Sequence, residues 1–265
     1  ASSAAQRILR IPELRLPLDH AEGSLRSAVV SQRGVPDADL HAFTVFKRAY
    51  DARKKSAIQL IYTVDCAVEG EARLLARFAG DPHVRPAPDM RYRFVTHAPA
   101  DFYAEQRPRP LVVGFGPCGL FAALILAQMG LAPIVLERGK AVRERTQDTW
   151  GLWRRGVLDP ESNVQFGEGG AGTFSDGKLW SQISDPRHLT RKVLDEFVKA
   201  GAPDEILFVS KPHIGTFRLV SMVEKMRADI VALGGEIRFQ QRVTDVLIEG
   251  GAVRGVTLAS GEHLH

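Results

Sequence analysis

The sequence predicts an α/β protein in two parts, a small α+β domain followed by a larger domain built on a parallel sheet. The first observation is an apolar run at 111–113, three glycines spaced G-x-G-x-x-G, a helical stretch and a second apolar run at 134–136. Short apolar runs of this kind are typical of buried parallel strands. The second observation is that the preceding residues alternate as strand, helix, two strands, helix and strand. The glycine-interrupted strand–helix–strand unit is the pattern of a Rossmann-like dinucleotide-binding domain.

Six elements are predicted in the front part, in the order of a ferredoxin-like fold. Residues 97–110 contain three prolines and no periodic pattern, so they read as the connection to the second part. We therefore place the boundary near residue 105, which gives domains 1–105 and 106–265. The six elements are an extended segment at 8–18, a helix from about Ala21 to Gln32, strands at His41–Ala49 and Ser56–Val68, a helix at Glu71–Phe78 and a strand near Arg91–Val95.

Each residue of the glycine motif has a predicted task. Gly114 allows the tight turn out of the strand, Gly116 lets the backbone approach a pyrophosphate, and Gly119 permits close packing of helix and strand. The helix N-terminus presents unpaired N–H groups and a partial positive charge to the phosphates, and Gly130 ends the helix. Glu137 closes the second strand and is placed to accept hydrogen bonds from ribose hydroxyls. An acid there repels a 2′-phosphate, so the motif favours FAD or NAD over NADP.

A second glycine-rich run follows at residues 163–178. Four glycines fall within residues 167–172, and they supply side-chain-free N–H groups that can lie against a ligand. A flexible linker has the same glycine content, but linkers seldom carry flanking aromatic residues such as Phe166, Phe174 and Trp180. The run therefore favours ligand contact over a linker.

The rest of the second part continues the alternation of helices and strands, and Thr216 is placed to cap the last helix. The chain stops where a doubly wound domain still needs another strand, so we expect this domain to be incomplete at its C-terminus. The predicted elements are a basic helical segment from Arg138 to Arg155, a helix at Arg187–Ala200, a short strand at Glu205–Val209, a helix from Thr216 to Leu233, and strands at Ile237–Phe239, Val243–Ile248 and Val253–Leu258.

Composition places few further limits on function. A hydrophobic content of 45% and a charged content of 25% are ordinary for a soluble globular protein, and no apolar run is long enough to span a membrane. The net charge of +4 and the pI near 9.2 suit phosphate-bearing ligands but fall short of a nucleic-acid-binding composition. The basic stretch Arg53–Lys55 lacks interleaved aromatic residues, which favours a solvated hairpin tip over an RNA contact.

The two cysteines indicate a reducing compartment, and we expect a cytoplasmic protein. Cys118 lies inside the glycine motif, where packing is a better explanation than redox chemistry. Residues 1–7 are small and polar and predict a loose tail without the apolar core of a signal peptide.

The candidates for catalysis are weak. His213 and Lys211 lie in a polar loop, residues 211–216, that contains a proline and a glycine, which is a plausible place for groups that touch a substrate. A lone histidine in a loop is more often structural or solvated. The sequence contains no cluster with metal-ligand spacing, and Cys118 has no recognisable base partner, so we predict no metal site.

Four segments together carry a family resemblance. They read GFGPCGLFAALILAQMG at 114–130, VLERG at 135–139, FGEGGAGTFSDGKL at 166–179 and KPHIGT at 211–216. The chain resembles, from about residue 8 to its end, bacterial proteins described as FAD-dependent or NAD(FAD)-utilizing dehydrogenases, within the glutathione-reductase-like flavoproteins. The resemblance implies a ferredoxin-like N-terminal piece, an FAD domain and an inserted substrate domain.

The same resemblance implies which residues would hold FAD. The first glycine motif would contact the pyrophosphate, Glu137 and Arg138 would lie at the adenosine ribose, and Val243 would meet the adenine through its backbone. Residues 169–176 would line the flavin side, whereas Phe217 stands where many relatives have an acid. Family members also continue into a strand that closes over the FAD, which this sequence lacks. The implied cofactor residues are Gly114, Gly116, Pro117, Cys118, Gly119, Glu137, Arg138, Gly169, Gly170, Ala171, Gly172, Thr173, Ser175, Asp176 and Val243.

The sequence therefore predicts an FAD-dependent oxidoreductase that acts on an unidentified small molecule, with NAD(P)H as a possible electron donor. One alternative is an NAD-dependent dehydrogenase without flavin, which leaves the second glycine-rich run unexplained. Another is a non-catalytic nucleotide-binding module that recruits a partner through its front domain. The oligomeric state stays open.

Overall fold

The computed structural model describes residues 8–81, 83–103 and 107–265. The chain divides into two units: unit 1 comprises Ala1–Arg91 with Asp204–Pro212, and unit 2 comprises Tyr92–Pro203 with His213–His265. The boundary predicted near residue 105 and the tail predicted at 1–7 lie outside the described residues. Each unit is described by itself below.

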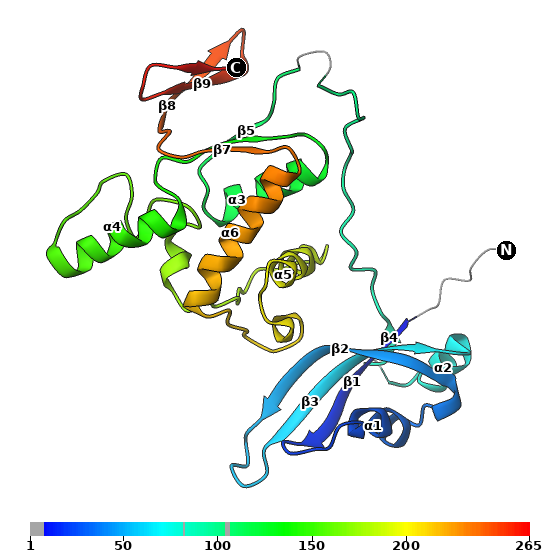
Figure 1. The fold of residues 1–265 in the computed structure, drawn as a ribbon. Helices are drawn as coiled ribbons and strands as arrows, with labels where there is room; N and C mark the ends of the chain where they lie inside the picture. The colour runs from blue at the N-terminus through cyan, green and yellow to red at the C-terminus, as the bar shows by residue number, and fades with distance from the viewer. Residues whose placement is uncertain (1–7, 82, 104–106) are drawn as a thin grey trace. The chain divides into compact units, whose positions relative to one another are not determined.

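Unit 1 is a four-stranded antiparallel sheet with the strand order β2-β3-β1-β4, and α1 lies on one face of it (Figure 1). Alternate residues of β3 are buried, because a strand presents every second side chain to the same face, and they join Leu25 and Val29 of α1 in one core. The elements are β1 (Ile8–Pro17), α1 (Ser24–Arg33), a 3₁₀ turn (Asp37–Asp39), β2 (Leu40–Asp51), β3 (Gln59–Val68), α2 (Glu71–Arg77) and β4 (Arg85–Pro86).

The strand predicted near Arg91–Val95 is wrong, because the fourth strand is the short β4, Arg85–Pro86. The Asp89 carboxylate accepts hydrogen bonds from the backbone N–H and the guanidinium of Arg91, a local turn that competes with strand pairing. The rings of Tyr92 and Phe94 pack edge to face with centroids 5.0 Å apart. Their alternation resembles a strand pattern but serves this local contact.

Residues 204–212, which we call the strap, extend the sheet of unit 1 at the β2 edge. The Arg48 N–H donates to the Phe208 carbonyl at 2.7 Å, and the Ser210 N–H donates to the Arg48 carbonyl at 3.1 Å, so that Val209 forms a parallel bridge with Arg48. The strand predicted at Glu205–Val209 is therefore wrong over most of its length. The strap begins as a 3₁₀ turn at Asp204–Leu207, because the Glu205 carbonyl accepts the N–H groups of Phe208 and Val209.

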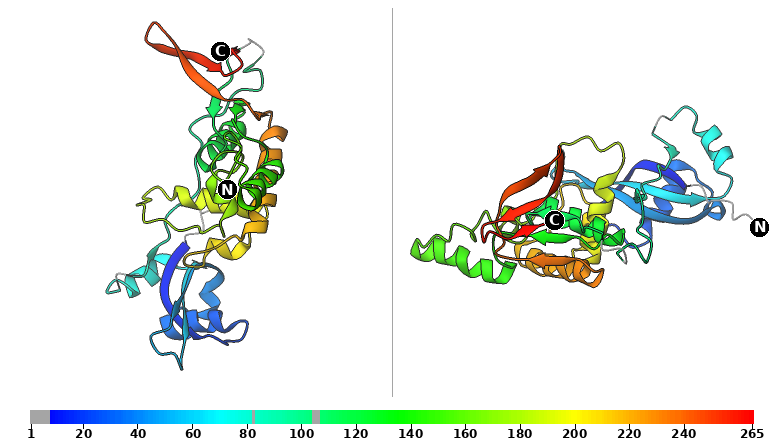
Figure 2. Two further views of the ribbon diagram at one scale, coloured as in Figure 1. Left: turned by 90° about the vertical axis from the view of Figure 1, so that its left-hand side faces the viewer. Right: turned by 90° about the horizontal axis from the view of Figure 1, so that it is seen from above.

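Unit 2 contains a three-stranded parallel sheet, order β5-β6-β7, and a three-stranded antiparallel ribbon, order β10-β9-β8. Helices α3 and α6 pack against each other and against the parallel strands, and the views in Figure 2 show the β8–β9 ribbon protruding from the helical body of this unit. The elements are β5 (Leu111–Val113), α3 (Pro117–Gln128), β6 (Ile134–Leu136), α4 (Val142–Arg155), a 3₁₀ turn (Ala171–Phe174), α5 (Leu189–Lys199), α6 (Thr216–Ala232), β7 (Glu236–Arg238), β8 (Val243–Glu249), β9 (Ala252–Leu258) and β10 (His263–Leu264).

Two predicted helix starts need correction. The basic segment is not helical from Arg138, because residues 137–141 form a connection in which the Gly139 N–H is bound to the Glu137 side chain, and α4 begins at Val142. Thr216 does not cap α6: Gly215 is the N-cap residue, and the Thr216 hydroxyl donates instead to the Ser175 carbonyl at 2.7 Å. None of the described helices combines the length and the apolar character needed to cross a membrane.

Candidate functional site

The first glycine segment, residues 114–119, links β5 to α3 as its spacing predicts. Gly114 has φ +90°, a conformation that favours glycine, and its N–H donates to the Leu136 carbonyl at 2.8 Å. A Cβ on Gly119 would overlap the Gly114 carbonyl oxygen, so the packing task predicted for Gly119 is confirmed. The helix begins with Gly116 as N-cap and Pro117 in the first turn, where proline costs no hydrogen bond. Pro117 and Cys118 are exposed, which leaves this helix end open to solvent.

The prediction that Cys118 serves packing is wrong. Cys118 is exposed at the start of α3. Cys66, on β3, is the packed cysteine, and burial raises the pKa of its thiol to about 12.

Glu137 makes contacts that the sequence did not reveal. Its carboxylate is buried, with Oε2 accepting the Phe115 N–H at 2.7 Å and Oε1 accepting the Gly139 N–H at 2.7 Å. Both neighbours are backbone groups, so the side chain ties the first glycine segment to the turn that follows β6. A carboxylate has about four lone-pair sites, and these two backbone N–H groups occupy two of them.

The second glycine segment, residues 167–172, packs against the first. The Gly169 N–H donates to the Phe115 carbonyl at 2.8 Å. A Cβ on Gly170 would lie 3.0 Å from Pro117 Cδ and 3.2 Å from Gly116 Cα, which is closer than such contacts normally come. Ala171 and Gly172 are exposed beside this contact. The run is therefore a packed wall next to the N-terminus of α3 and not a linker.

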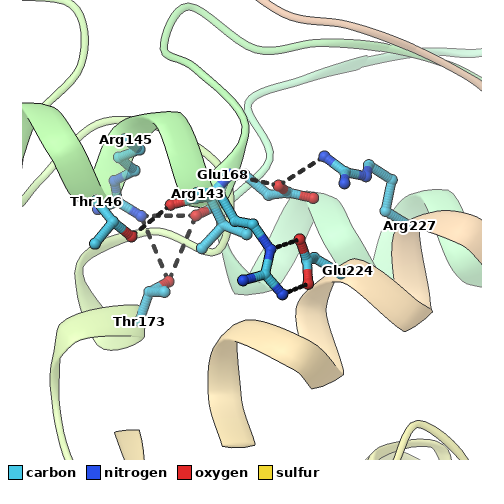
Figure 3. A network of polar contacts seen from close by, with 8 residues as sticks. Arg143, Arg145, Thr146, Glu168, Thr173, Glu224 and Arg227 are labelled. Carbon is cyan, nitrogen blue, oxygen red and sulfur yellow. Dashed lines mark hydrogen bonds and ion pairs between the residues drawn. The ribbon is translucent and has the colours of Figure 1, made fainter. Parts of the chain in front are cut away.

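Sequence reasoning missed Arg145, a fully buried arginine of α4. It donates to backbone carbonyls along the second glycine segment and just before it (Figure 3). Burial lowers the pKa of its guanidinium to about 10. No signal in the sequence separates it from Arg143, Arg154 and Arg155 of the same basic helix.

Glu168 is the second buried charge that was missed. Its Oε2 accepts the Val142 N–H at 2.7 Å, which caps α4, and the Arg227 Nη1–H at 3.0 Å. Its Oε1 has no hydrogen-bond partner within the described part of the chain. Burial raises the pKa of this carboxyl group, against the opposing hydrogen bond from Val142 and the charge of Arg227.

The structure brings His213 to Asp176, although 37 positions separate them. His213 Nδ1 lies 3.2 Å from Asp176 Oδ2, and the segments hold together through the Gly215 N–H, which donates to the Asp176 carbonyl at 2.9 Å. Both side chains are about half exposed. Lys211, the other catalytic candidate, belongs to the strap of unit 1. Phe217, at the start of α6, is almost fully exposed.

A cavity of about 450 Å³ opens beside Arg138, between the turn after β6 and the connection from β7 to β8. Arg138 and Arg242 share Glu161 in ion pairs of 2.6 and 3.0 Å, so the wall carries cations already partly balanced by an acid. Ser162 is buried, and its Oγ has no hydrogen-bond partner among the described residues. The lining includes Arg138, Lys140, Ser162, Gln240, Gln241 and Arg242, and the half-buried Val243 follows directly.

Over residues 8–81, 83–103 and 107–265, no group of three His, Cys, Asp or Glu side chains is arranged to hold a metal ion. The site described above consists of backbone amides, buried charges and the His213–Asp176 pair.

Comparison with known proteins gives two sequence matches. A family described as a domain of unknown function, DUF8436, matches residues 8–67, which run from β1 through most of β3. An uncharacterized protein of Clostridium beijerinckii is 39% identical over 250 residues. The match covers 94% of this chain but 46% of that protein, so the chain spans about half of its length.

Similar solved structures include THI4 of Thermovibrio ammonificans, with a TM-score of 0.36 and 17% identity over 60% of this chain and 50% of that one. A 3-ketosteroid-Δ4-(5α)-dehydrogenase of Rhodococcus jostii, solved with 4-androstene-3,17-dione, scores 0.37 at 14% identity over 60% and 46% of the two chains. Glycine oxidase of Bacillus cereus scores 0.30 at 15% identity over 60% and 54%.

Proposed function

We propose that this chain is the FAD-binding part of an oxidoreductase that acts on a small molecule. The observation that carries the proposal is the pair of glycine segments packed on each other at the open N-terminus of α3. Amides of a helix N-terminus, with no side chain in front of them, suit a pyrophosphate. A nicotinamide dinucleotide alone needs the first segment, whereas a second wall of exposed backbone at Ala171 and Gly172 suits a cofactor with a large ring system beside the pyrophosphate.

The adenosine half of FAD is assigned to the cavity beside Arg138. Glu137 immediately precedes Arg138 and keeps two lone-pair sites for ribose hydroxyls, while the unpartnered Ser162 hydroxyl and the Gln240 and Gln241 side chains offer polar contacts to an adenine. Val243 directly follows Arg242, a lining residue of this cavity, and we assign its backbone to the adenine. Glu161 at the cavity wall, and Glu137, which directly precedes the lining residue Arg138, support FAD over a ligand with a 2′-phosphate.

The redox chemistry itself would come from the flavin, which accepts or gives a hydride when it is bound. The residues of this chain would hold the flavin in position and transfer a proton to or from the substrate. Gly169, Gly170, Ala171, Gly172, Thr173, Ser175 and Asp176 form the wall assigned to the flavin side. With the proton on Nδ1 directed at Asp176, the Nε2 atom of His213 is free to take a proton from a substrate, and we assign proton transfer to this pair rather than to Lys211.

Unit 1 is assigned to the ferredoxin-like class, because its element order and its antiparallel strand order β2-β3-β1-β4 agree with that topology. The rival role of unit 1 as a recruiter of RNA has weak support. Arg53 pairs with Asp51 at the tip between β2 and β3, which favours a solvated hairpin. We also propose that the protein is cytoplasmic and that NAD(P)H reduces its flavin.

The test is cofactor binding by the purified protein and by two alanine variants. A Cβ at Gly116 would lie 3.7 Å from Gly170 Cα, an ordinary contact, and φ there is −74°. Gly116→Ala is therefore expected to leave the unfolding temperature unchanged while it places a methyl group where the pyrophosphate would approach. Gly80→Ala in unit 1, where a Cβ also meets nothing within 4 Å and which lies outside the proposed site, is the control.

Visible absorption of the unaltered protein, chromatography of the ligand that heat releases, and the rise in unfolding temperature with added FAD or NAD are the measurements. We expect FAD to stabilise the unaltered protein and the Gly80→Ala variant to the same extent and Gly116→Ala much less, with an affinity at least about tenfold weaker for Gly116→Ala. Stabilisation by NAD alone would instead favour the flavin-free dehydrogenase. Stabilisation by neither would contradict dinucleotide binding by this chain.

A further inference from the structure

Arg145 holds together a stretch of backbone that has no regular secondary structure of its own. Its guanidinium donates through Nε to the Asn163 carbonyl at 2.8 Å and through Nη2 to the Val164 carbonyl at 2.7 Å. Nη1 donates to the carbonyls of Glu168 and Gly170 at 2.7 and 2.8 Å. Figure 3 shows the side chain pointing from α4 into this stretch, with Thr173 on its far side. One side chain therefore fixes both ends of the segment from 163 to 170.

Burying the Arg145 guanidinium costs free energy. A buried cation loses its hydration, and every hydrogen bond described for Arg145 goes to a neutral oxygen and not to a carboxylate. The Phe174 ring adds a cation–π contact, with its centroid 4.8 Å from Arg145 Cζ. Only the planar fork of an arginine supplies donors in all of these directions, because a lysine carries three donors on one nitrogen.

The glycine at position 167 is explained by the same side chain. Gly167 has φ +120°, and a Cβ there would overlap Arg145 Cδ and lie 2.9 Å from its Nε. Gly139 also packs tightly against Gly167, since a Cβ on Gly139 would lie 2.6 Å from Gly167 Cα. Arg145 thus lies directly against the backbone that leads into Gly169 and Gly170, the residues that contact the first glycine segment.

We propose that Arg145 is a positioning residue for the cofactor: it sets the second glycine segment against Phe115, Gly116 and Pro117, and so shapes the surface on which the dinucleotide binds. This inference rests on the proposed function. Arg145 does not touch the ligand in this scheme. It acts through four backbone carbonyls. We expect its loss to increase the mobility of residues 163–170 more than that of any other part of the chain.

The experiment compares Arg145→Met and Arg145→Lys with Arg143→Met as the matched control. Arg143 lies two positions earlier on α4, but its side chain is 70% exposed and pairs with Glu224. Hydrogen–deuterium exchange of the ligand-free proteins is measured in residues 163–173 and, as an internal reference, in β3 of unit 1. Affinity is then measured with FAD as the probe.

Both Arg145 variants are expected to exchange faster in residues 163–173 with β3 unchanged. They should bind FAD about 10- to 100-fold more weakly, the range seen when a residue that orients a metal ligand is lost. Arg143→Met should change neither quantity. Arg145→Met leaves the Asn163 and Val164 carbonyls without their donor, whereas the Glu168 and Gly170 carbonyls still accept from Thr173. Arg145→Lys is the variant that decides if Arg145→Met fails to fold. Native exchange or native FAD affinity in Arg145→Lys would overturn the proposal.

A failure of the proposed function gives a different result from a failure of the positioning role of Arg145. If the unaltered protein binds no FAD, the role toward the cofactor is overturned together with that function. Faster exchange confined to residues 163–173 would then still support the positioning of the segment itself, and unchanged exchange would overturn that as well.

Discussion

The two glycine segments of unit 2 contain glycine for different physical reasons. In the first, residues 114–119, the requirement comes from the segment itself: Gly114 turns with positive φ, and Gly119 has no room for a Cβ beside the Gly114 carbonyl. In the second, residues 167–172, positive φ values are joined by contacts from elsewhere in the chain, since Gly167 meets Arg145 and Gly170 meets Pro117. A local glycine pattern can be recognised in a sequence, whereas glycines imposed by distant residues form no pattern with those residues.

The largest effect we predict is for Gly119→Ala. The new Cβ would overlap backbone, the carbonyl of Gly114, and backbone between a strand and a helix cannot move aside cheaply. We expect a loss of about 3 kcal/mol in the free energy of unfolding, measured by urea denaturation. Gly172→Ala, in open space, should stay within about 0.5 kcal/mol of the unaltered protein. A near-native Gly119→Ala would mean that helix and strand are not held as closely as described.

A smaller loss is predicted for Gly167→Ala. The positive φ is unfavourable for alanine, but the atom in the way is the Cδ of a side chain, Arg145, which can shift in part. We expect about 2 kcal/mol in the same urea experiment. A loss equal to that of Gly119→Ala would show that Arg145 yields as little as backbone does, and the difference drawn between the two segments would then disappear.

The smallest predicted effect is the pH dependence that Glu168 contributes. Burial raises the pKa of its carboxyl group above the ordinary value of 4.5, so in the window just above 4.5 the folded protein binds more protons than the unfolded chain. Stability from this group is present below pH 4.5 and falls as the pH rises through the raised pKa. Glu168→Gln, which keeps an oxygen for the Val142 N–H, should lose less stability over that rise than the unaltered protein.

The measurement is the midpoint of urea unfolding at a series of pH values, taken as the difference between the two proteins so that other titrating groups cancel. Glu224→Gln provides the control, because Arg143 lowers the pKa of Glu224 and the sign of its contribution is opposite. Parallel pH profiles for the unaltered protein and Glu168→Gln would mean that the buried carboxyl does not titrate differently on folding.

Local features were predicted well because they depend on neighbours in the chain. The turn at Gly114, the close packing at Gly119 and the left-handed Gly130 after α3 all follow from spacing. The elements of unit 1 were predicted except for the last strand, where alternating rings at Tyr92 and Phe94 resemble a strand but serve a local contact. The strap was read as a strand of its own, although a helical turn and a bridge to Arg48 form there.

In the candidate site, too, some features follow from neighbours in the sequence and others from distant residues. The sequence by itself determined the strand, glycine turn, helix and acid from Leu111 to Glu137, because each step depends on residues that are close together in the chain. Only the tertiary structure decided that Glu137 binds the N–H of Phe115, that Asp176 meets His213, and that Arg145, unlike Arg143, is buried. The physical reason is that burial and pairing of a charged side chain depend on which distant backbone closes around it, and neither residue type nor spacing records that.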